Sequence, residues 1–157
     1  MLRRSLLAAV VFATVTGCGA AARAGEPEVA GETYVPVHSS VMAGDGRTRI
    51  DLAVTLSIHN ASETKTVEVR RIDYYDGAGR RIESRLAAPT RLAPFATLEI
   101  FIPKSDVRGG TGANFVVGWA GEGAIAEPVI EAVMIGDFAN QSYSFVSTGR
   151  RIELVRP

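Results

Sequence analysis

Residues 50–59 read Ile-Asp-Leu-Ala-Val-Thr-Leu-Ser-Ile-His, and this stretch decides the fold class. A large aliphatic residue stands at every second position from Ile50 to Ile58. Because successive side chains of a β-strand point to opposite faces, the alternation places all of these aliphatic side chains on one face. The stretch therefore predicts a half-buried β-strand whose other face is polar or small.

The rest of the chain repeats this alternation in short segments. A slip in its phase near Arg70 and Arg71 predicts a β-bulge, and Asp76–Gly79 reads as a hairpin turn. Residues 129–135 are apolar at nearly every position, which is typical of a central strand covered on both faces. Beyond residues 50–59, we expect strands at residues 67–74, 82–86, 98–102, 115–119, 129–135, 143–147 and 152–155.

Turn signals recur about every 8 to 12 residues, and no segment holds the apolar spacing of a helix. The pattern predicts an all-β domain, namely an immunoglobulin-like β-sandwich of about seven to nine strands, with a small β-barrel as the alternative. Cys18 is the single cysteine, so no internal disulfide is available and the stability must come from the core. A domain of this size buries roughly two-thirds of its unfolded surface, which is enough.

The first residues carry the features of an export signal. Arg3 and Arg4 precede an uncharged apolar run from Ser5 to Thr16. This run rises about 18 Å as a helix, whereas a hydrocarbon core is roughly 30 Å thick, so a cleaved signal is favoured over a membrane span. We expect residues 1–17 to be a signal peptide, residues 18–31 a flexible tether and residues 32–157 a single β-sandwich domain.

Two cleavage sites compete. Val15–Cys18 resembles the bacterial lipobox, in which the cysteine receives a diacylglycerol and becomes the first residue of the mature protein. Cleavage after Ala24 by ordinary signal peptidase is the alternative. The place of Cys18 directly after the apolar run favours lipidation, and Gly19 slightly favours the outer membrane. We expect a lipoprotein on the periplasmic face of a bacterial membrane, with a soluble periplasmic or secreted protein as the alternative.

The charge pattern bounds the class of partner. The chain holds 17 basic and 17 acidic residues with both signs interleaved, and no basic block stands out. This argues against a nucleic-acid partner and against a polybasic membrane patch.

The most site-like feature is the loop at residues 108–114, Arg-Gly-Gly-Thr-Gly-Ala-Asn. Its glycines and asparagine tolerate left-handed backbone and are able to expose N–H groups to an anion or another ligand. However, nucleotide-binding loops follow a strand and open a helix, whereas this loop precedes a strand. A tight loop between strands is favoured; the candidate ligand-binding residues are Arg108, Gly109, Gly110, Thr111, Gly112 and Asn114.

Residues for a metal or catalytic site are sparse. His38 and Met42 are four apart and His59 lies further on, but without a thiol in the domain we expect neither a metal nor a cofactor. Ser105 is followed by Asp106, yet no Gly-x-Ser-x-Gly elbow occurs, so we assign no catalytic residue.

Two further groups are open to interpretation. Asp73 with Asp76 suggests acid–base chemistry, although a solvated hairpin is favoured. Tyr143 and Phe145 share one face of a strand, and Tyr74 and Tyr75 lie near the hairpin. These aromatic side chains form either a recognition surface or, as we favour, a cap on the sandwich core.

Six segments, Tyr34–Val37, Leu52–Ile58, Tyr74–Asp76, Gly112–Phe115, Glu127–Gly136 and Ser144–Ser147, carry a family resemblance. Together they resemble a bacterial family catalogued only as a domain of unknown function, number three-one-two-four, over residues 34–152. The resemblance implies a small exported or lipid-anchored protein, and it carries over no activity, cofactor or catalytic residue.

These patterns favour a non-enzymatic envelope domain, anchored through Cys18, that binds an envelope protein or a glycan. The alternative is a small periplasmic ligand-binding protein or hydrolase with its site at residues 108–114. The sequence indicates no oligomeric state.

Overall fold

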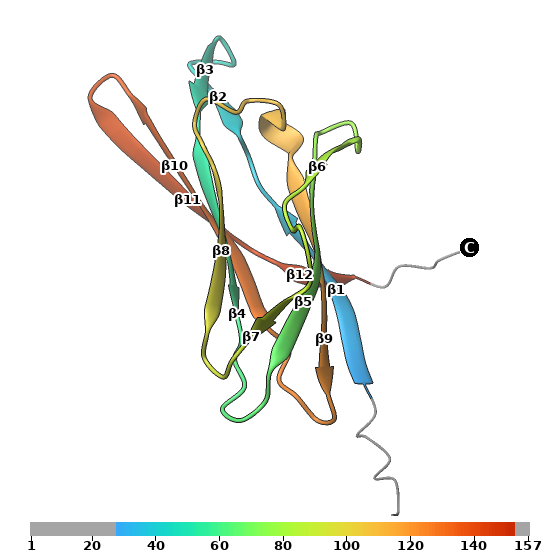
Figure 1. The fold of residues 1–157 in the computed structure, drawn as a ribbon. Coiled ribbons are helices and arrows are strands. Elements are labelled where there is room, and N and C mark those ends of the chain that lie inside the picture. Colours follow the sequence, from blue (N-terminus) through green and yellow to red (C-terminus); the bar gives the residue numbers. More distant parts are fainter. Residues whose placement is uncertain (1–27, 153–157) are drawn as a thin grey trace, which may run out of the picture.

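The computed structural model describes residues 28–152, and its strands are arranged in two facing layers (Figure 1). Within this range the elements in chain order are β1 (Glu28–Pro36), β2 (Ser40–Ala43), β3 (Thr48–Asp51), β4 (Ala53–His59), β5 (Val67–Tyr75), β6 (Arg81–Ser84), β7 (Thr90–Leu92), β8 (Thr97–Ile102), the 3₁₀ turn η1 (Gly110–Gly112), β9 (Asn114–Glu122), β10 (Val129–Phe138), β11 (Gln141–Thr148) and β12 (Arg150–Ile152).

One layer is a six-stranded sheet in the order β12-β1-β9-β5-β6, in which β7 also pairs with β5. The other layer is a four-stranded sheet in the order β11-β10-β4-β8, and β2 and β3 form a separate two-stranded hairpin. All of these pairings are antiparallel. The chain passes from the four-stranded to the six-stranded sheet at Gly149, between β11 and β12.

The predicted β-sandwich is confirmed, and the alternative of a small barrel is wrong because the described strands form separate sheets rather than one closed sheet. The described part of the chain contains twelve strands, more than the seven to nine expected. The additional strands include β2 and β7, which are four and three residues long and too short for alternation to mark them.

The core lies between the two sheets. Val54, Leu56 and Ile58 of β4 are fully buried, as the alternation predicted. Across the sandwich they face a layer that includes Tyr74 of β5 and Phe115 of β9, whose rings stack with centroids 4.9 Å apart. Burial of such side chains stabilises the fold by roughly 1.5–3 kcal/mol each.

The predicted bulge is confirmed, since the register of β5 against β9 shifts between Val69 and Arg71. The predicted turn at Asp76–Gly79 is also present: the Asp76 carboxylate accepts hydrogen bonds from the N–H groups of Ala78 and Arg80, both at 2.9 Å. Gly79 has φ +76°, a backbone conformation that favours glycine.

The predicted boundary between tether and domain is too late in the chain. Residues 28–31 belong to β1, where Gly31 lies opposite Trp119 of β9. A Cβ at Gly31 would lie 2.8 Å from the Trp119 ring, so this glycine is needed for the close packing. The composition of residues 28–31 resembles that of a linker, because small residues such as Gly31 suit a flexible tether and also a strand that packs against a large ring. The predicted signal peptide, the earlier part of the tether and Cys18 lie outside the described residues.

The prediction that residues 129–135 are covered on both faces is wrong. Burial alternates along β10: Ile130, Ala132 and Met134 are buried, whereas Val129 and Ile135 are 48% and 54% exposed. The strand is central within its sheet, but no further layer of the described residues covers the outer face. Within residues 28–152, no helix is long and apolar enough to cross a membrane.

Candidate functional site

The Gly-rich loop is bonded to neighbouring segments. The N–H of Gly110 donates to the Ser39 hydroxyl at 2.8 Å, and its carbonyl accepts from the N–H of Ser39 at 3.0 Å. Gly112 packs against Gly77 of the β5–β6 hairpin, so that a Cβ on either would lie 3.0–3.3 Å from the other's Cα. The loop therefore joins the start of β2 to the β5–β6 hairpin, as expected of a tight structural loop.

Arg108, the one charged candidate in this loop, is paired within the protein. Its guanidinium lies 2.7 Å from the Asp106 carboxylate and 3.0 Å from that of Glu83. The hydrogen bonds from Arg108 hold the pKa of Asp106 below its usual value. The ligand site at residues 108–114 stays a prediction, and a ligand would have to compete with these two carboxylates for Arg108.

The two aspartates considered for acid–base chemistry each have arginine partners. Asp73 is buried and lies 3.4 Å from Arg71 and 3.7 Å from Arg81. Asp76 is paired with Arg80 at 2.8 Å. The two carboxylates are therefore paired with different arginines, Asp73 with Arg71 and Arg81 and Asp76 with Arg80.

The two histidines contact different segments. Nδ1 of His38 lies 2.6 Å from the carbonyl of Thr111, and Nδ1 of His59 lies 2.9 Å from the hydroxyl of Thr97. Over residues 28–152, no three His, Cys, Asp or Glu side chains gather in a way that would hold a metal ion.

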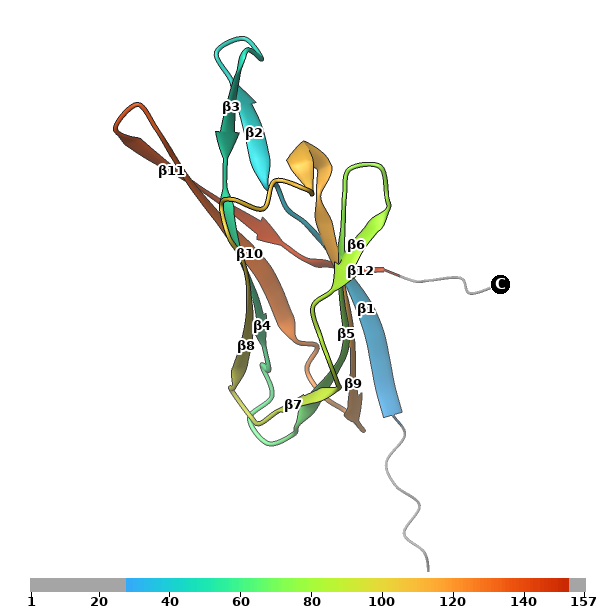
Figure 2. The same cartoon turned by 45° about the horizontal axis from the view of Figure 1, so that its top comes forward.

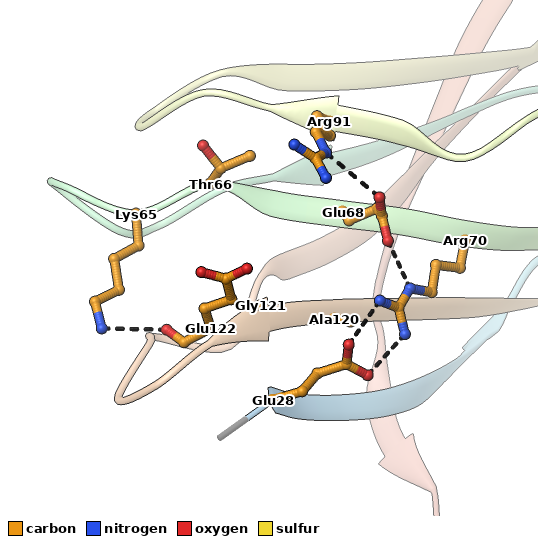
Figure 3. A pocket seen from close by; sticks show the side chains of 9 residues that line it. All are labelled: Glu28, Lys65, Thr66, Glu68, Arg70, Arg91, Ala120, Gly121 and Glu122. Atoms are coloured by element: carbon orange, nitrogen blue, oxygen red, sulfur yellow. Dashed lines mark hydrogen bonds and ion pairs between the residues drawn. The ribbon is translucent and has the colours of Figure 1, made fainter. Parts of the chain in front are cut away.

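An open hollow of about 350 Å³ lies at one end of the six-stranded sheet (Figure 3). Its walls come from β1, β5, β7 and β9 and from the segment before β5. Six of the nine lining residues are charged, three acidic and three basic. The lining consists of Glu28, Lys65, Thr66, Glu68, Arg70, Arg91, Ala120, Gly121 and Glu122.

Four of the charged side chains of this hollow, Glu28, Glu68, Arg70 and Arg91, are paired with one another, as the dashed lines of Figure 3 show. The Lys65 ammonium donates to the backbone carbonyl of Glu122 at 3.1 Å. Arg70 donates two bonds of 2.8 Å to Glu28 and one of 2.7 Å to Glu68. These hydrogen bonds raise the pKa of Arg70 and lower the pKa of both carboxyl groups. Because the planar guanidinium already holds two carboxylates, it offers no open fork to an anionic ligand. The hollow is thus a network of surface ion pairs.

The aromatic residues divide between core and surface. Tyr74 caps the core as favoured, being fully buried against Phe115. Tyr143 and Phe145, in contrast, are 36% and 40% exposed, so for them the favoured interpretation was wrong. The physical reason is visible in Figures 1 and 2, where the β10–β11 hairpin extends beyond the facing sheet, which therefore cannot cover its end.

The outer face of the four-stranded sheet carries an exposed apolar row. The register places Phe101 opposite Thr55, Thr55 opposite Val133, and Val133 opposite Val146. Since residues directly opposite in an antiparallel pair point to the same face, this row crosses all four strands. Ile135 lies two residues along β10 on the same face. Phe101, Ile135 and Val146 are 56%, 54% and 65% exposed. We call Phe101, Val133, Ile135 and Val146 the apolar patch.

Charged residues flank the apolar patch on two sides. On one side, Glu99 and Glu131 lie opposite Ser57 in the next row of the sheet. On the other side, Lys104 and Asp137 form an ion pair at 2.6 Å. An apolar centre with a charged rim is the arrangement found at protein–protein interfaces. Exposed apolar side chains gathered on one face commonly mark an interaction site.

Sequence reasoning missed the apolar patch, although a signal was present. Phe101 stands at a position of β8 that alternates with the inward-facing residues, and Val133 and Ile135 do so in β10. In β11, Val146 alternates with Tyr143 and Phe145. An apolar residue at such a position in one strand is common. Its recurrence in three strands of one sheet becomes apparent only when the pairing is known.

Comparison with known proteins identifies the family. Residues 30–152 match the family described as "Protein of unknown function (DUF3124)". The chain is also similar in fold to the solved structure described as "Crystal Structure of Thermotoga maritima 1070", with 9% sequence identity and a TM-score of 0.46, over 76% of this chain and 92% of that one. No curated protein matches the chain. The family match covers nearly the whole described domain and confirms the resemblance seen in the sequence, so this chain belongs to the DUF3124 family.

Proposed function

We propose that this protein is a non-enzymatic domain of the bacterial cell envelope that binds another envelope protein through the apolar patch. The observation that carries the proposal is the row from Phe101 to Val146 on the uncovered face of the four-stranded sheet. Removing such side chains from water favours association by about 25 cal/mol per Å² of apolar area.

The rim of the patch indicates the chemistry of the partner. Glu99 and Glu131 make one side acidic, so a partner with an apolar centre and basic residues beside it would complement this face. A protein fits better than a glycan, because the side chains at the centre are aliphatic or phenyl groups without hydrogen-bonding atoms. Sugar hydroxyls buried there would lose their hydrogen bonds to water.

A binding role is favoured over a catalytic one by the state of the charged groups in the candidate sites. Arg70 is held by Glu28 and Glu68, and Arg108 by Asp106 and Glu83. Such pairing stabilises charges that a catalytic site would leave available for a substrate.

The envelope address in this proposal is supported by the sequence of the first residues, which resembles a signal peptide followed by a lipobox. A lipid on Cys18 would hold the domain at the periplasmic face of a membrane, and a tether of about 10 residues would let it reach roughly 20 Å from the lipid surface. Intact mass of the membrane-extracted protein tests this part. The expected mass begins at Cys18 with acyl chains, and Cys18→Ala is expected to abolish the lipid. A mass that begins at Gly25 would contradict the anchor.

The binding role is tested by site-specific photo-crosslinking in cells. A photoreactive residue at Phe101 or Ile135 is expected to give one discrete adduct with another envelope protein. The matched control is the same residue at Tyr34, an exposed aromatic position on the six-stranded sheet, which is expected to give none. Adding Glu99→Lys and Glu131→Lys to the variant that carries the photoreactive residue should reduce the yield of the adduct several-fold. Equal labelling from all positions, or no adduct from the patch, would count against the proposal.

A further inference from the structure

β11 is an edge strand without the usual protection of an edge. It pairs with β10 on one side and with no described strand on the other. Its eight residues make it longer than the other edge strands of the two main sheets, which have three to six residues. All of its residues except Ser147 are exposed.

The other edges of the two main sheets carry charge. Each of them contains at least one Arg or Glu: Arg150 and Arg151 in β12, Arg81 and Glu83 in β6, Arg91 in β7 and Glu99 in β8. β11 reads Gln-Ser-Tyr-Ser-Phe-Val-Ser-Thr and contains no charged residue and no proline. Proteins blunt exposed edges with charge, proline or short length, because unpaired N–H and C=O groups are a template for another strand. β11 uses none of these devices.

The hairpin geometry shows which backbone groups of β11 are available. Its loop is Ala139–Asn140, with φ values of 49° and 64°, the pattern of a two-residue type I′ turn. In such a hairpin the flanking residues Phe138 and Gln141 form a hydrogen-bonded pair, and such pairs alternate along the strands. The odd-numbered residues of β11 therefore bond to β10. The N–H and C=O groups directed to the open edge belong to Ser142, Ser144, Val146 and Thr148.

We propose that β11 pairs antiparallel with β11 of a second copy of this chain, about a two-fold axis at Ser144. The two four-stranded sheets then become one eight-stranded sheet. In this register Ser144 lies opposite Ser144 of the second copy, and Tyr143 lies opposite Phe145 of the second copy. The same contact recurs with the roles exchanged, as two-fold symmetry requires.

The side chains of β11 favour a second copy as the occupant. Because the strand is uncharged, two copies meet without like-charge repulsion. Tyr143 and Phe145 bond to β10, so across the new interface they occupy non-hydrogen-bonded pairs, where opposite residues approach most closely. Both rings are more than a third exposed in the single chain, and the pairing would cover them. The hairpin end also extends beyond the facing sheet in Figures 1 and 2, which leaves this edge accessible.

The dimer is separate from the proposed envelope partner. It uses the backbone edge of β11 and the core-facing aromatic residues, whereas the partner binds the outer face of the sheet. It is measured on the purified chain alone, while the partner is measured in cells, so either idea can fail without the other.

The test uses the full chain with Cys18→Ala, in which no native thiol remains. Ser144→Cys in this background is expected to form a disulfide-linked dimer in air, since a hydrogen-bonded antiparallel pair sets the Cα atoms about 5.5 Å apart, within the range that a disulfide spans. The matched control is Thr97→Cys on the edge strand β8, which is expected to remain largely monomeric. Reductant should reverse the link without dissociating the dimer at high concentration.

A second pair of variants probes the edge itself. Ser144→Pro removes an N–H directed to the open edge and keeps the ladder to β10, and Ser144→Lys adds charge with little change to the backbone. Each is expected to raise the dissociation constant of the dimer at least tenfold, as measured by sedimentation equilibrium. Circular dichroism checks that each variant keeps the fold. A chain that sediments as a monomer throughout, or equal crosslinking of Ser144→Cys and Thr97→Cys, would overturn the proposal. So would a heterologous strand captured at β11 by a monomeric chain.

Discussion

Val133 of β10 lies directly opposite Val146 of β11, and this pair carries the exposed apolar row to the open edge of the four-stranded sheet. On the core-facing side, apolar residues of β10 such as Ala132 and Met134 are covered by the other sheet. The Val133–Val146 pair faces outward, where no other described strand lies above it. The pair therefore connects the two surfaces proposed for association, since Val146 belongs both to the apolar patch and to the uncharged strand.

Val146→Lys is expected to change the free energy of unfolding by less than about 0.5 kcal/mol, because the side chain is 65% exposed. It should also reduce the binding of a hydrophobic dye. The matched control is Val54→Lys, which places a charge in the core and should cost several kcal/mol or prevent folding. Urea unfolding measures both, and similar losses in the two variants would show that Val146 is covered in the isolated protein.

Asn60→Ala is expected to destabilise the fold by about 2–3 kcal/mol. The buried side-chain amide of Asn60 donates to the carbonyls of Lys65 and Leu92 at 2.8 and 3.0 Å, and its oxygen accepts from the N–H of Ser62 at 2.9 Å. The substitution leaves these groups without partners. Asn140→Gly, in the exposed β10–β11 turn, is the control and should cost less than about 1 kcal/mol. Equal effects in thermal unfolding would contradict the bracing role of Asn60.

Tyr74→Phe tests a buried hydroxyl that makes no hydrogen bond of good geometry within the described residues. Burial raises the pKa of Tyr74, and the Ser39 hydroxyl opposes part of the rise. The folded pKa of Tyr74 is higher than its unfolded value of about 10. The resulting contribution to the free energy of unfolding is therefore fully present below pH ~10 and is lost as the pH rises through the folded pKa. The variant should match the wild type within about 1 kcal/mol at pH 7 and lose less stability above pH ~10. Tyr143→Phe, at an exposed ring, should follow the wild type.

Asp106→Asn is expected to remove a small, pH-dependent contribution of less than about 1 kcal/mol, because Arg108 is half-exposed and solvent screens the pair. Arg108 lowers the pKa of Asp106, so the stabilisation is present above the unfolded value of about 3.9 and is lost as the pH falls through the lower folded value. The difference between wild type and variant should thus disappear in strong acid. Asp45→Asn, in the exposed β2–β3 turn, is the control. A difference that persists unchanged at pH 2 would contradict this assignment.

Local patterns were sufficient for much of the fold. The alternation at residues 50–59 marks the buried side chains correctly, because one face of a half-buried strand must be apolar whatever its neighbours are. The structure divides this stretch at Leu52, however, into the end of β3 and the whole of β4, which belong to different sheets. The bulge near Arg70 and the turn at Asp76–Gly79 were also readable, since each depends on the phase or conformation of a few adjacent residues.

Patterns failed where an apolar or small residue has two physical explanations. Along the apolar run of β10, successive residues alternate between the core and the outer face of the sheet, and composition cannot separate the two sets. Similarly, Gly31 suits a flexible tether and also a strand packed under Trp119.

By itself, the sequence determined the all-β class, the main strands, the family and the expectation of an exported protein. Those features depend on local periodicity, turn chemistry and the order of residues in the chain. Only the tertiary structure decided that Phe101, Val133 and Val146 share one exposed row and that β11 is an open edge. It also decided that Arg70 and Arg108, beside their pairs with carboxylates two residues away, are each bound by a carboxylate distant in sequence, Glu28 and Glu83 respectively. These relationships arise from strand register and pairing, which bring together residues as far apart in sequence as Glu32 and Ile152. No local pattern encodes which strand lies beside which.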